Sequence, residues 1–375
     1  MKLIAAVLVV LLFYFIQKVI YSKYWEKGLS TDVRFSKEFI ECGEHAELIE
    51  SVTNDKNLPL PIFQFKTSVD RNLRFEDMEN SVVTDRYYRN DIFSLLGRQK
   101  VERKLVFEAT HRGIYAVDSI NVLAKDFFLV STFATSVDSD ARIIVFPKKL
   151  DISALDPMFR GILGEIQARH SVVEDSLTFR GIRDYRTSDG YRSINWKQSA
   201  KSINKLKVNV YDFTMDAEVR ILVNLDTETM IETDRLLETS ISIASSAVRR
   251  FLLEHVKVSV NTNGTKEEEG SEILPNPGAG AELSHSATID KYLAGVKGSA
   301  GTEAFLTQLD REKIERGERV LYLIISPYYK EDLLQKLDSL ERAGLSVVMV
   351  VPYYDKHGFH ATRPWMYGWK LSLIE

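Results

Sequence analysis

The chain has 375 residues, of which 45% are hydrophobic and 27% are charged. It is therefore long enough for two domains and has the composition of a globular protein rather than a disordered one. Its net charge of −4 gives no overall attraction to nucleic acid. Cys42 is the single cysteine, which excludes an intramolecular disulfide and a cysteine-based zinc cluster.

The first segment of the chain is strongly apolar. An unbroken apolar run extends over Leu3–Ile16, and it continues after Gln17 and Lys18 as far as Tyr21. About 20 residues span a bilayer, so the run suffices if the Lys18 side chain extends to the lipid headgroups. A cleaved signal peptide is the alternative, but the small residues of a cleavage site do not follow the run. We therefore predict an uncleaved transmembrane anchor over residues 1–28, in a single-pass protein of the cell membrane.

The charges beside this segment predict its orientation. Lys18, Lys23 and Lys27 lie on its C-terminal side, whereas Lys2 and the amino terminus lie on the other. By the positive-inside rule, the flank that is richer in lysine stays in the cytoplasm. We therefore expect the bulk of the chain to be cytoplasmic.

Residues 29–149 show the pattern of short β-strands separated by turn residues. The alternation of side chains is clearest around Val101, Leu105 and Phe107, which recur on one side of an extended segment. We predict a β-sandwich-like domain here. The pattern assigns no element to residues 70–90. The predicted strands are Ala46–Thr53, Phe63–Val69, Val101–Thr110, Ile114–Leu123 and Ile143–Phe146.

Residues 150–217 form a connector that ends in an unusual segment. A short helix is expected at Ser153–Leu163. The segment Phe179–Phe213 combines several aromatic residues with an excess of basic over acidic residues. Within it we predict a helix over Gly190–Ser202 and an extended strand-like stretch over Leu206–Phe213.

This segment carries the spacing G-x-R-x-Y-x-x-x-D-x-x-R-x-I-x-W-K-x-S-A-K. The spacing resembles the signature of the bacterial domain of unknown function 58 family, except that Thr187 and Ser188 stand where that family usually has Pro-Gly. The resemblance implies a membrane-anchored protein with a von Willebrand factor A-like domain and a MoxR-type AAA+ ATPase as its partner. Ile194 and Ala200 belong to the matched positions. The candidate partner-binding residues are Gly181, Arg183, Tyr185, Asp189, Arg192, Trp196, Lys197, Ser199 and Lys201.

Residue types alone leave other roles open for the same segment. Buried Trp and Tyr side chains ringed by Arg–Asp pairs would suit a domain junction, and we favour that structural role over direct ligand binding. Binding of phosphate or nucleic acid by Arg180–Lys207 is a further alternative, which predicts an affinity that falls steeply with salt. We expect no nucleic-acid partner.

Residues 218–375 alternate between apolar strands and amphipathic helices, which indicates βαβ units and a parallel sheet. The resemblance implies that this parallel-sheet domain is von Willebrand factor A-like. The predicted fold class is then a von Willebrand factor A-like α/β parallel-sheet domain plus an N-terminal β-sandwich-like domain and one transmembrane helix. The predicted strands are Val219–Leu225, Val256–Val260, Val320–Ile325 and Ser346–Val351, and the predicted helices are Glu232–Glu254, Thr288–Leu293 and Lys330–Ala343.

The loops after two of these strands could hold a metal ion, because ligands of open parallel sheets bind at the carboxyl ends of the strands. Asp226, Glu228 and Ser326 lie there. A Mg²⁺ site of the adhesion type needs hydroxyl ligands beside the carboxylate, but Glu228 and Met230 occupy those positions, and a thioether is a poor ligand for a hard cation. We predict no metal or other cofactor, with Mg²⁺ at these degenerate positions as the disfavoured alternative.

Signatures of common enzymes are missing from the sequence, which has no phosphate-binding P-loop, no H-E-x-x-H zinc motif and no G-x-S-x-G elbow. We predict a membrane-anchored, non-enzymatic adaptor or scaffold that binds a protein partner in the assembly or maturation of other proteins. The alternative is a metal-dependent extracellular binding or adhesion module that acts through Asp226 and Glu228.

Overall fold

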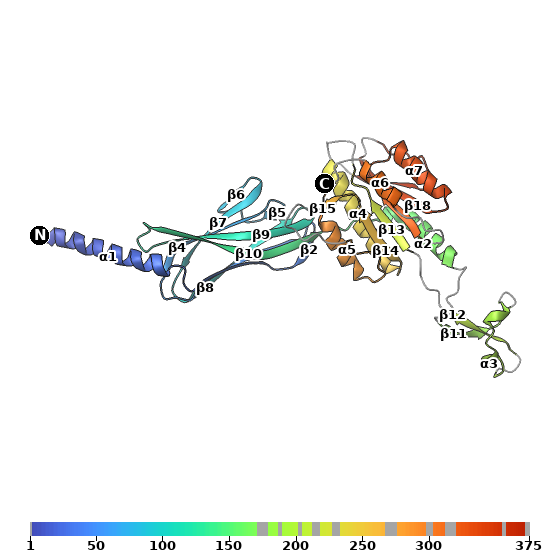
Figure 1. Ribbon diagram of the computed structural model, residues 1–375, viewed down its shortest axis with the longest axis horizontal. Helices are drawn as coiled ribbons and strands as arrows, with labels where there is room; N and C mark the ends of the chain where they lie inside the picture. The colour runs from blue at the N-terminus through green and yellow to red at the C-terminus, as the bar shows by residue number, and fades with distance from the viewer. Residues whose placement is uncertain are drawn as a thin grey trace. The chain divides into compact units, whose positions relative to one another are not determined.

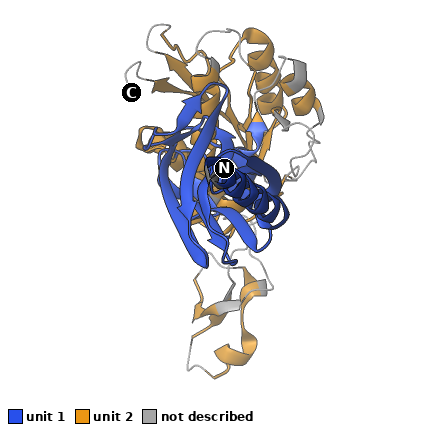
Figure 2. Ribbon diagram, turned by 90° about the vertical axis from the view of Figure 1, so that its left-hand side faces the viewer, with its two compact units in different colours: residues 1–148, 290–296 blue, residues 149–289, 297–375 orange. Residues whose placement is uncertain are grey.

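The computed structural model divides the chain into two compact units (Figure 2). Unit 1 comprises residues 1–148 and 290–296, and unit 2 comprises residues 149–289 and 297–375. The structure describes residues 2–170, 179–186, 190–201, 205–211, 218–226, 233–266, 276–297, 303–311, 320–354 and 358–371.

Unit 1 begins with the long apolar helix α1 (Lys2–Tyr24), drawn in blue in Figure 1. Its residues Leu3–Tyr24 are long and apolar enough to cross a membrane, and no other helix among the described residues meets that condition. Gln17, Tyr21 and Trp25 are buried, and their spacing of four residues places them on one face, which packs against the strands of unit 1. The structure thus confirms an apolar N-terminal helix at the position of the predicted anchor.

Two sheets make up the rest of unit 1. The four-stranded sheet has the order β1-β3-β8-β5, and the six-stranded sheet has the order β2-β10-β9-β4-β7-β6. All pairings are antiparallel except that of β2 with β10. The strands are β1 (Leu29–Phe35), β2 (Phe39–Glu41), β3 (His45–Asn54), β4 (Leu60–Asp70), β5 (Leu73–Phe75), β6 (Ser81–Val83), β7 (Arg86–Leu95), β8 (Gln99–Ala109), β9 (Gly113–Lys125) and β10 (Thr132–Phe146).

The core of unit 1 lies between the two sheets, as in a β-sandwich. In β4, Phe63, Phe65 and Val69 are buried, while Gln64 and Lys66 between them are not, which is the period of two expected for a strand with one inward face. Leu48 of β3 and Phe107 of β8 belong to the same core cluster from the four-stranded sheet. The predicted strands of this region are all present.

The structure also places elements in residues 70–90, where the sequence pattern assigned none. This stretch contains β5, β6 and the start of β7. In β7 the inward positions of the alternating pattern include Arg89 and Asp91, which are buried between Tyr87 and Phe93. Because charged residues occupy positions that are normally apolar, the hydrophobic alternation that marks a strand is hidden there.

Unit 2 contains a five-stranded sheet with the order β14-β13-β17-β18-β19, in which every pairing is parallel. Every residue of β17 is buried, as expected for a strand covered on both faces. The strands are β13 (Glu218–Val223), β14 (Lys257–Thr262), β17 (Val320–Ile325), β18 (Ser346–Tyr354) and β19 (Met366–Leu371).

Helices accompany this sheet. The longest is α4, whose apolar face includes Ile241, Ala244, Val248 and Phe251, all fully buried. The helices are η1 (Ser153–Leu155), α2 (Asp156–His170), α4 (Thr233–Leu253), α6 (Glu303–Arg311) and α7 (Glu331–Arg342). The chain also forms α5 (His285–Ala294), β15 (Thr265–Lys266) and β16 (Val296–Lys297). The helices and strands predicted over residues 219–351 are present, and α6 was not predicted.

The predicted fold class, however, was wrong. We predicted a von Willebrand factor A-like α/β parallel-sheet domain plus an N-terminal β-sandwich-like domain and one transmembrane helix, but the sheets of unit 1 are antiparallel or mixed and contain most of the strands in the described part of the chain. Only the five-stranded sheet there is all-parallel. The error came from the weight given to the clear βαβ alternation of the second half and to the family resemblance of residues 179–213.

Candidate functional site

The motif segment of the sequence folds as a hairpin. β11 (Phe179–Asp184) pairs with β12 (Lys207–Tyr211) in an antiparallel ladder, which confirms the extended stretch expected at residues 206–213 over its described part. Between these strands lie a 3-10 turn, η2 (Tyr191–Ser193), and a single helical turn, α3 (Trp196–Ser199). The continuous helix predicted over Gly190–Ser202 was therefore wrong.

Ile194 explains why that helix is interrupted. Its backbone is extended, with φ −67° and ψ 123°, and it forms an isolated antiparallel bridge with Val208. Both side chains are buried, so burial of Ile194 against β12 outweighs continuation of the helix. Asn195 then caps α3, because its Oδ1 accepts a hydrogen bond of 3.0 Å from the Gln198 amide and its Nδ2 donates one of 2.7 Å to Asn209.

The aromatic residues of the motif are exposed rather than buried. Trp196 is 66% exposed and Tyr191 is 78% exposed. Tyr191 also stacks with Tyr185, with ring centroids 6.4 Å apart. The interpretation of this segment as a junction built on buried aromatic side chains was wrong for these two residues, because side chains so exposed contribute little to packing within the described part of the chain.

Two exposed lysines lie close to Trp196 in the chain. Lys197 directly follows it and Lys201 comes five positions later. Asp184 pairs with Lys205 at 3.5 Å and with Lys207, and the hydrogen bond from Lys207 lowers the pKa of the Asp184 carboxyl group. The hairpin therefore neutralises its own aspartate with two lysines and leaves the lysines near Trp196 facing solvent.

The remaining motif positions are mostly structural or undescribed. Ser199 accepts a hydrogen bond of 2.8 Å from the Lys207 amide at Oγ and thereby ties α3 to β12. Arg183 donates a hydrogen bond of 3.1 Å to the carbonyl of Asp184, and Gly181 lies at an irregularity of β11. Asp189 and the side chain of Arg192 lie outside the described residues.

A second group of polar residues lies at the carboxyl edge of the parallel sheet. The chain order reverses there between β13 and β17, which is the place where such sheets bind ligands. Asn224 links the two predicted residues: its Nδ2 donates a hydrogen bond of 3.0 Å to Ser326 Oγ, and its Oδ1 accepts one of 2.9 Å from the Asp226 amide. Asn263 Nδ2 donates to Asp226 Oδ1 at 2.8 Å. All members except Asn263 are fully buried.

This arrangement offers little to a hard cation. The described part of the chain contains no group of three or more His, Cys, Asp or Glu side chains that could hold a metal ion. Glu228, the second predicted carboxylate, lies outside the described residues. Asp226 directs Oδ1 to an amide donor, whereas a Mg²⁺ site needs further oxygen ligands around the ion. What the geometry achieves is a rigid link between the ends of β13 and β17.

Sequence reasoning did not identify the two asparagines of this group. Asn224 lies two positions before the predicted Asp226, and Asn263 directly follows β14, which is the neighbouring strand of the sheet. The sequence does carry a signal for them, because Asn, Asp and Asn side chains follow two strands that are neighbours in the sheet. The ends of parallel strands meet at one edge, so these side chains could have been expected to lie close together.

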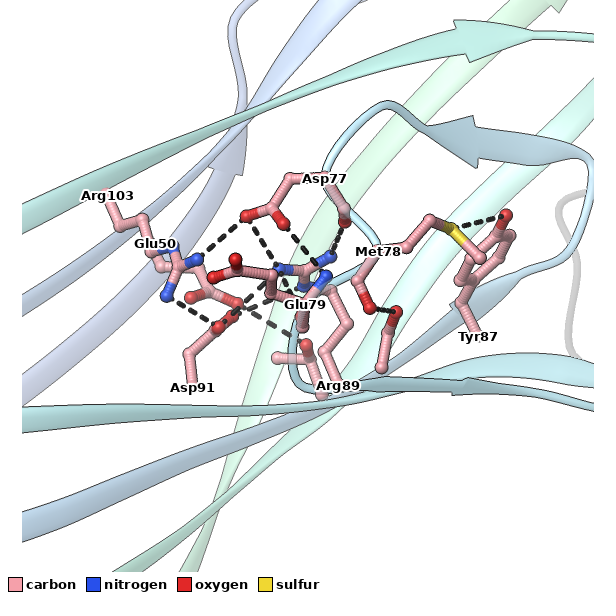
Figure 3. A network of polar contacts seen from close by, with 10 residues as sticks. Glu50, Asp77, Met78, Glu79, Tyr87, Arg89, Asp91 and Arg103 are labelled. Atoms are coloured by element: carbon pink, nitrogen blue, oxygen red, sulfur yellow. Dashed lines mark hydrogen bonds and ion pairs between the residues drawn. The ribbon is translucent and has the colours of Figure 1, made fainter.

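A third polar group, which no sequence motif marks, lies between the sheets of unit 1 (Figure 3). Arg89 Nε lies 3.2 Å from Asp91 Oδ2, and both side chains are fully buried. Arg103 lies 2.7 Å from Asp91 Oδ1 and 2.8 Å from Asp77 Oδ2. Arg89 also donates a hydrogen bond of 2.7 Å to the carbonyl of Asp77. Each arginine therefore has a carboxylate partner, as buried charges require.

Glu50 of β3 completes this charge cluster. Burial raises the pKa of Glu50 to about 8, and the nearby Asp91 carboxylate adds to the shift. Thr67 donates a hydrogen bond of 3.4 Å to Glu50 Oε1. With Glu50 protonated, Arg89 and Arg103 balance Asp77 and Asp91, so the cluster is electrically neutral. Its position between strands of both sheets suits a structural role.

Comparison with known proteins gave matches among solved structures only. No family model matches the chain, and no curated protein matches it. The chain is similar to a CARDB domain from Pyrococcus furiosus, at 14% identity over 30% of this chain and 91% of that domain, with a TM-score of 0.19. It is also similar to a non-cellulosomal cohesin from Archaeoglobus fulgidus, at 13% identity over 35% of this chain and 97% of the cohesin, with a TM-score of 0.22.

Proposed function

We propose that this chain is a membrane-anchored, non-enzymatic adaptor that binds a protein partner through the hairpin face around Trp196. The observation that carries the proposal is the exposure of Trp196 and Tyr191 beside Lys197 and Lys201. Large aromatic side chains dominate the binding energy of protein interfaces, because they bury much apolar area at a small entropic cost. The anchor would be α1, the apolar N-terminal helix.

The chemistry of this face favours an acidic partner surface. Lysines that flank an exposed tryptophan attract carboxylates and raise the rate of encounter. The spacing of the motif resembles that of the domain of unknown function 58 family, and on that resemblance we propose a MoxR-type AAA+ ATPase as the partner, with a role in the assembly or maturation of other proteins. Such a partner requires a cytoplasmic orientation, which the lysines after the apolar run of α1 favour.

The absence of catalytic function is part of the proposal. What supports it is the use of Asp226 and Ser326, which lie where a ligand of the parallel sheet would bind. Ser326 accepts a hydrogen bond from Asn224 and so joins the ends of β17 and β13, while Asp226 accepts one from Asn263 after β14. The metal-dependent alternative would require Asp226 to exchange its amide donor for a cation. Calorimetric titration of the purified chain with Mg²⁺ and Mn²⁺ tests this alternative. Heat of binding at millimolar metal in the wild type, together with its loss in Asp226→Asn, would favour the metal-dependent module.

The decisive experiment compares variants of the hairpin face in native membranes. We expect the wild-type chain, solubilised at low salt, to retain an ATPase of the MoxR type, and we expect Trp196→Ala and Lys197→Glu/Lys201→Glu to lose it. Tyr88→Ala is the matched control, since Tyr88 is an exposed aromatic residue of β7 in unit 1. An intact complex that lacks any such ATPase would argue against the partner, and unchanged retention by Trp196→Ala would argue against the binding face.

A further inference from the structure

The turn between β9 and β10 has an unusual composition. Residues 127–130 have the sequence Phe-Phe-Leu-Val, and all four side chains are exposed. Hairpin turns normally carry polar residues and glycine, and a run of four exposed large apolar residues marks a surface that some partner covers.

Three hydrogen bonds hold the backbone of this turn, and Asp126 takes part in each of them. The Asp126 amide donates to the Ser131 carbonyl at 3.1 Å, and the Leu129 amide donates to the Asp126 carbonyl at 3.0 Å. The Val130 amide donates to Asp126 Oδ1 at 2.8 Å. The Asp126 side chain is fully buried beneath the turn. The turn therefore directs the Asp126 carboxylate and its bonded amides inward, while its four apolar side chains face outward.

The turn lies directly against α1 (Figure 1). The ring centroid of Phe128 lies 6.0 Å from that of Phe13 and 6.1 Å from that of Tyr14. One turn further along the helix, Gln17 Nε2 donates a hydrogen bond of 2.9 Å to Asp126 Oδ2. The apolar turn is therefore level with the middle of the apolar helix.

The length of α1 decides at which depth this contact occurs. The helix residues before the first buried position, Leu3–Ile16, number about 14 and rise about 21 Å at 1.5 Å per residue. The hydrocarbon core of a bilayer is about 30 Å thick. A membrane crossed by α1 therefore extends about 9 Å further along the helix, to about Ser22, and encloses the level of Phe13, Tyr14 and the turn.

The residues at the C-terminal end of α1, where such a membrane would end, have the chemistry of the membrane interface. Lys23 and Lys27 place their ammonium groups 5.8 Å and 5.0 Å from the ring centroid of Tyr24. Tyrosine and lysine are typical of the headgroup layer. The Leu96 side chain, in the β7–β8 turn, is also exposed, and its carbonyl accepts a hydrogen bond from Asn54.

We infer that residues 127–130 insert into the hydrocarbon layer beside α1, so that the partner of this apolar turn is the lipid bilayer itself. The inference rests on the proposed membrane anchoring by α1. Unit 1 would then have two attachments to the membrane, the helix and the turn, and Asp126 and Gln17 would join them below the surface. A second copy of the chain or another membrane protein covering the turn are the competing outcomes.

The test measures the depth of three valines with matched exposure in the full chain. Val9 in α1 is 66% exposed, Val130 in the turn is 67% exposed, and Val82 in β6 is 64% exposed. Each is replaced by cysteine in a Cys42→Ser background, in which the serine hydroxyl takes the place of the thiol as donor to the Thr110 carbonyl. An environment-sensitive fluorophore on each cysteine is then read in dilute phosphatidylglycerol–phosphatidylcholine vesicles, with and without bromine on the lipid acyl chains.

We expect brominated lipid to cause loss of fluorescence at Val9→Cys and Val130→Cys and to leave Val82→Cys unchanged. Loss at position 9 without loss at position 130 would overturn the inserted turn and leave the anchor in place. Absence of loss at position 9 would overturn the anchor and with it the proposed function. Equal loss at positions 130 and 82 would also overturn the inference, because insertion would then not be specific to the turn.

Discussion

Gln17 of α1 and Asp126 of the β9–β10 turn join through a side-chain hydrogen bond of 2.9 Å, and both side chains are buried. The bond links two residues that are 109 positions apart in the chain. Because Asp126 also holds the Val130 amide, the turn depends on both partners for its shape.

We predict that Gln17→Leu loosens the turn from α1. Removing one partner of a buried polar pair costs about 1–3 kcal/mol, because the other partner keeps its desolvation penalty. Hydrogen exchange at the Leu129 and Val130 amides should therefore accelerate in the reconstituted chain. Gln335→Leu is the control, since Gln335 is an exposed residue of α7. Unchanged exchange in Gln17→Leu would show that the turn holds its shape without the helix.

Arg89 should be among the most sensitive positions of unit 1. Arg89→Met would leave Asp91 fully buried with one arginine fewer, and breaking a buried ion pair in this way costs about 3–5 kcal/mol. Arg34→Met should cost less than about 1 kcal/mol, because Arg34 is exposed and its nearest carboxylate oxygens are at 3.7 Å and 3.9 Å. The urea midpoint of unit 1 can be followed in detergent by pulse labelling of Cys42, and equal midpoints for the two variants would contradict this account.

Glu50 should make the stability of unit 1 depend on pH. Its pKa is about 8 in the folded chain against an ordinary value of 4.5, so the folded state binds the extra proton between these two limits. The associated stability is fully present below pH 4.5 and is lost as pH rises through about 8. We expect the urea midpoint of the wild type to fall over this window.

Glu50→Gln should remove most of that slope, since the amide stays neutral at every pH while occupying a similar volume. Glu47→Gln serves as the control on the same strand, because Glu47 faces away from the core. A slope that persists in Glu50→Gln would assign the pH dependence to other groups.

Trp196 and Ile194 should separate binding from folding in the hairpin. Trp196→Ala is expected to change hairpin stability by less than about 0.5 kcal/mol, as surface substitutions usually do, and still to abolish partner retention. Ile194→Ala should cost about 2–5 kcal/mol, because the Ile194 side chain is buried against β12. Hydrogen exchange of the β12 amides measures both. Loss of protection in Trp196→Ala would mean that the ring has a structural role.

The sequence predicted well those elements whose pattern is local. β17 is a continuous apolar run and α4 repeats apolar residues at helical spacing, so each could be recognised without knowledge of its neighbours. β7 could not be recognised in this way, because Arg89 and Asp91 at its inward positions are stabilised by partners on other strands. The break at Ile194 likewise depends on Val208, which belongs to a later strand.

The candidate sites also separate into features that a local pattern predicts and features that depend on distant residues. Asp226 and Ser326 were predicted at one edge of the sheet, and the structure connects them, because the ends of parallel strands must meet there. Asn263 donates a hydrogen bond to Asp226 only because of the path that the chain takes after β14. No local sequence pattern reveals that path. The exposure of Trp196 was missed for the opposite reason: an aromatic residue in a charged segment is more often buried, and only the folded hairpin shows otherwise.

The polar cluster between the sheets constrains the order in which the chain can mature. Its members extend from Glu50 to Arg103, so a ribosome must release β8 before Arg89 and Asp91 can leave water with all their partners in place. By then α1 has long emerged, and the Gln17–Asp126 bond must wait for a still later segment. During synthesis the proposed anchor α1 is therefore available to a membrane first and receives its β-strand neighbours afterwards.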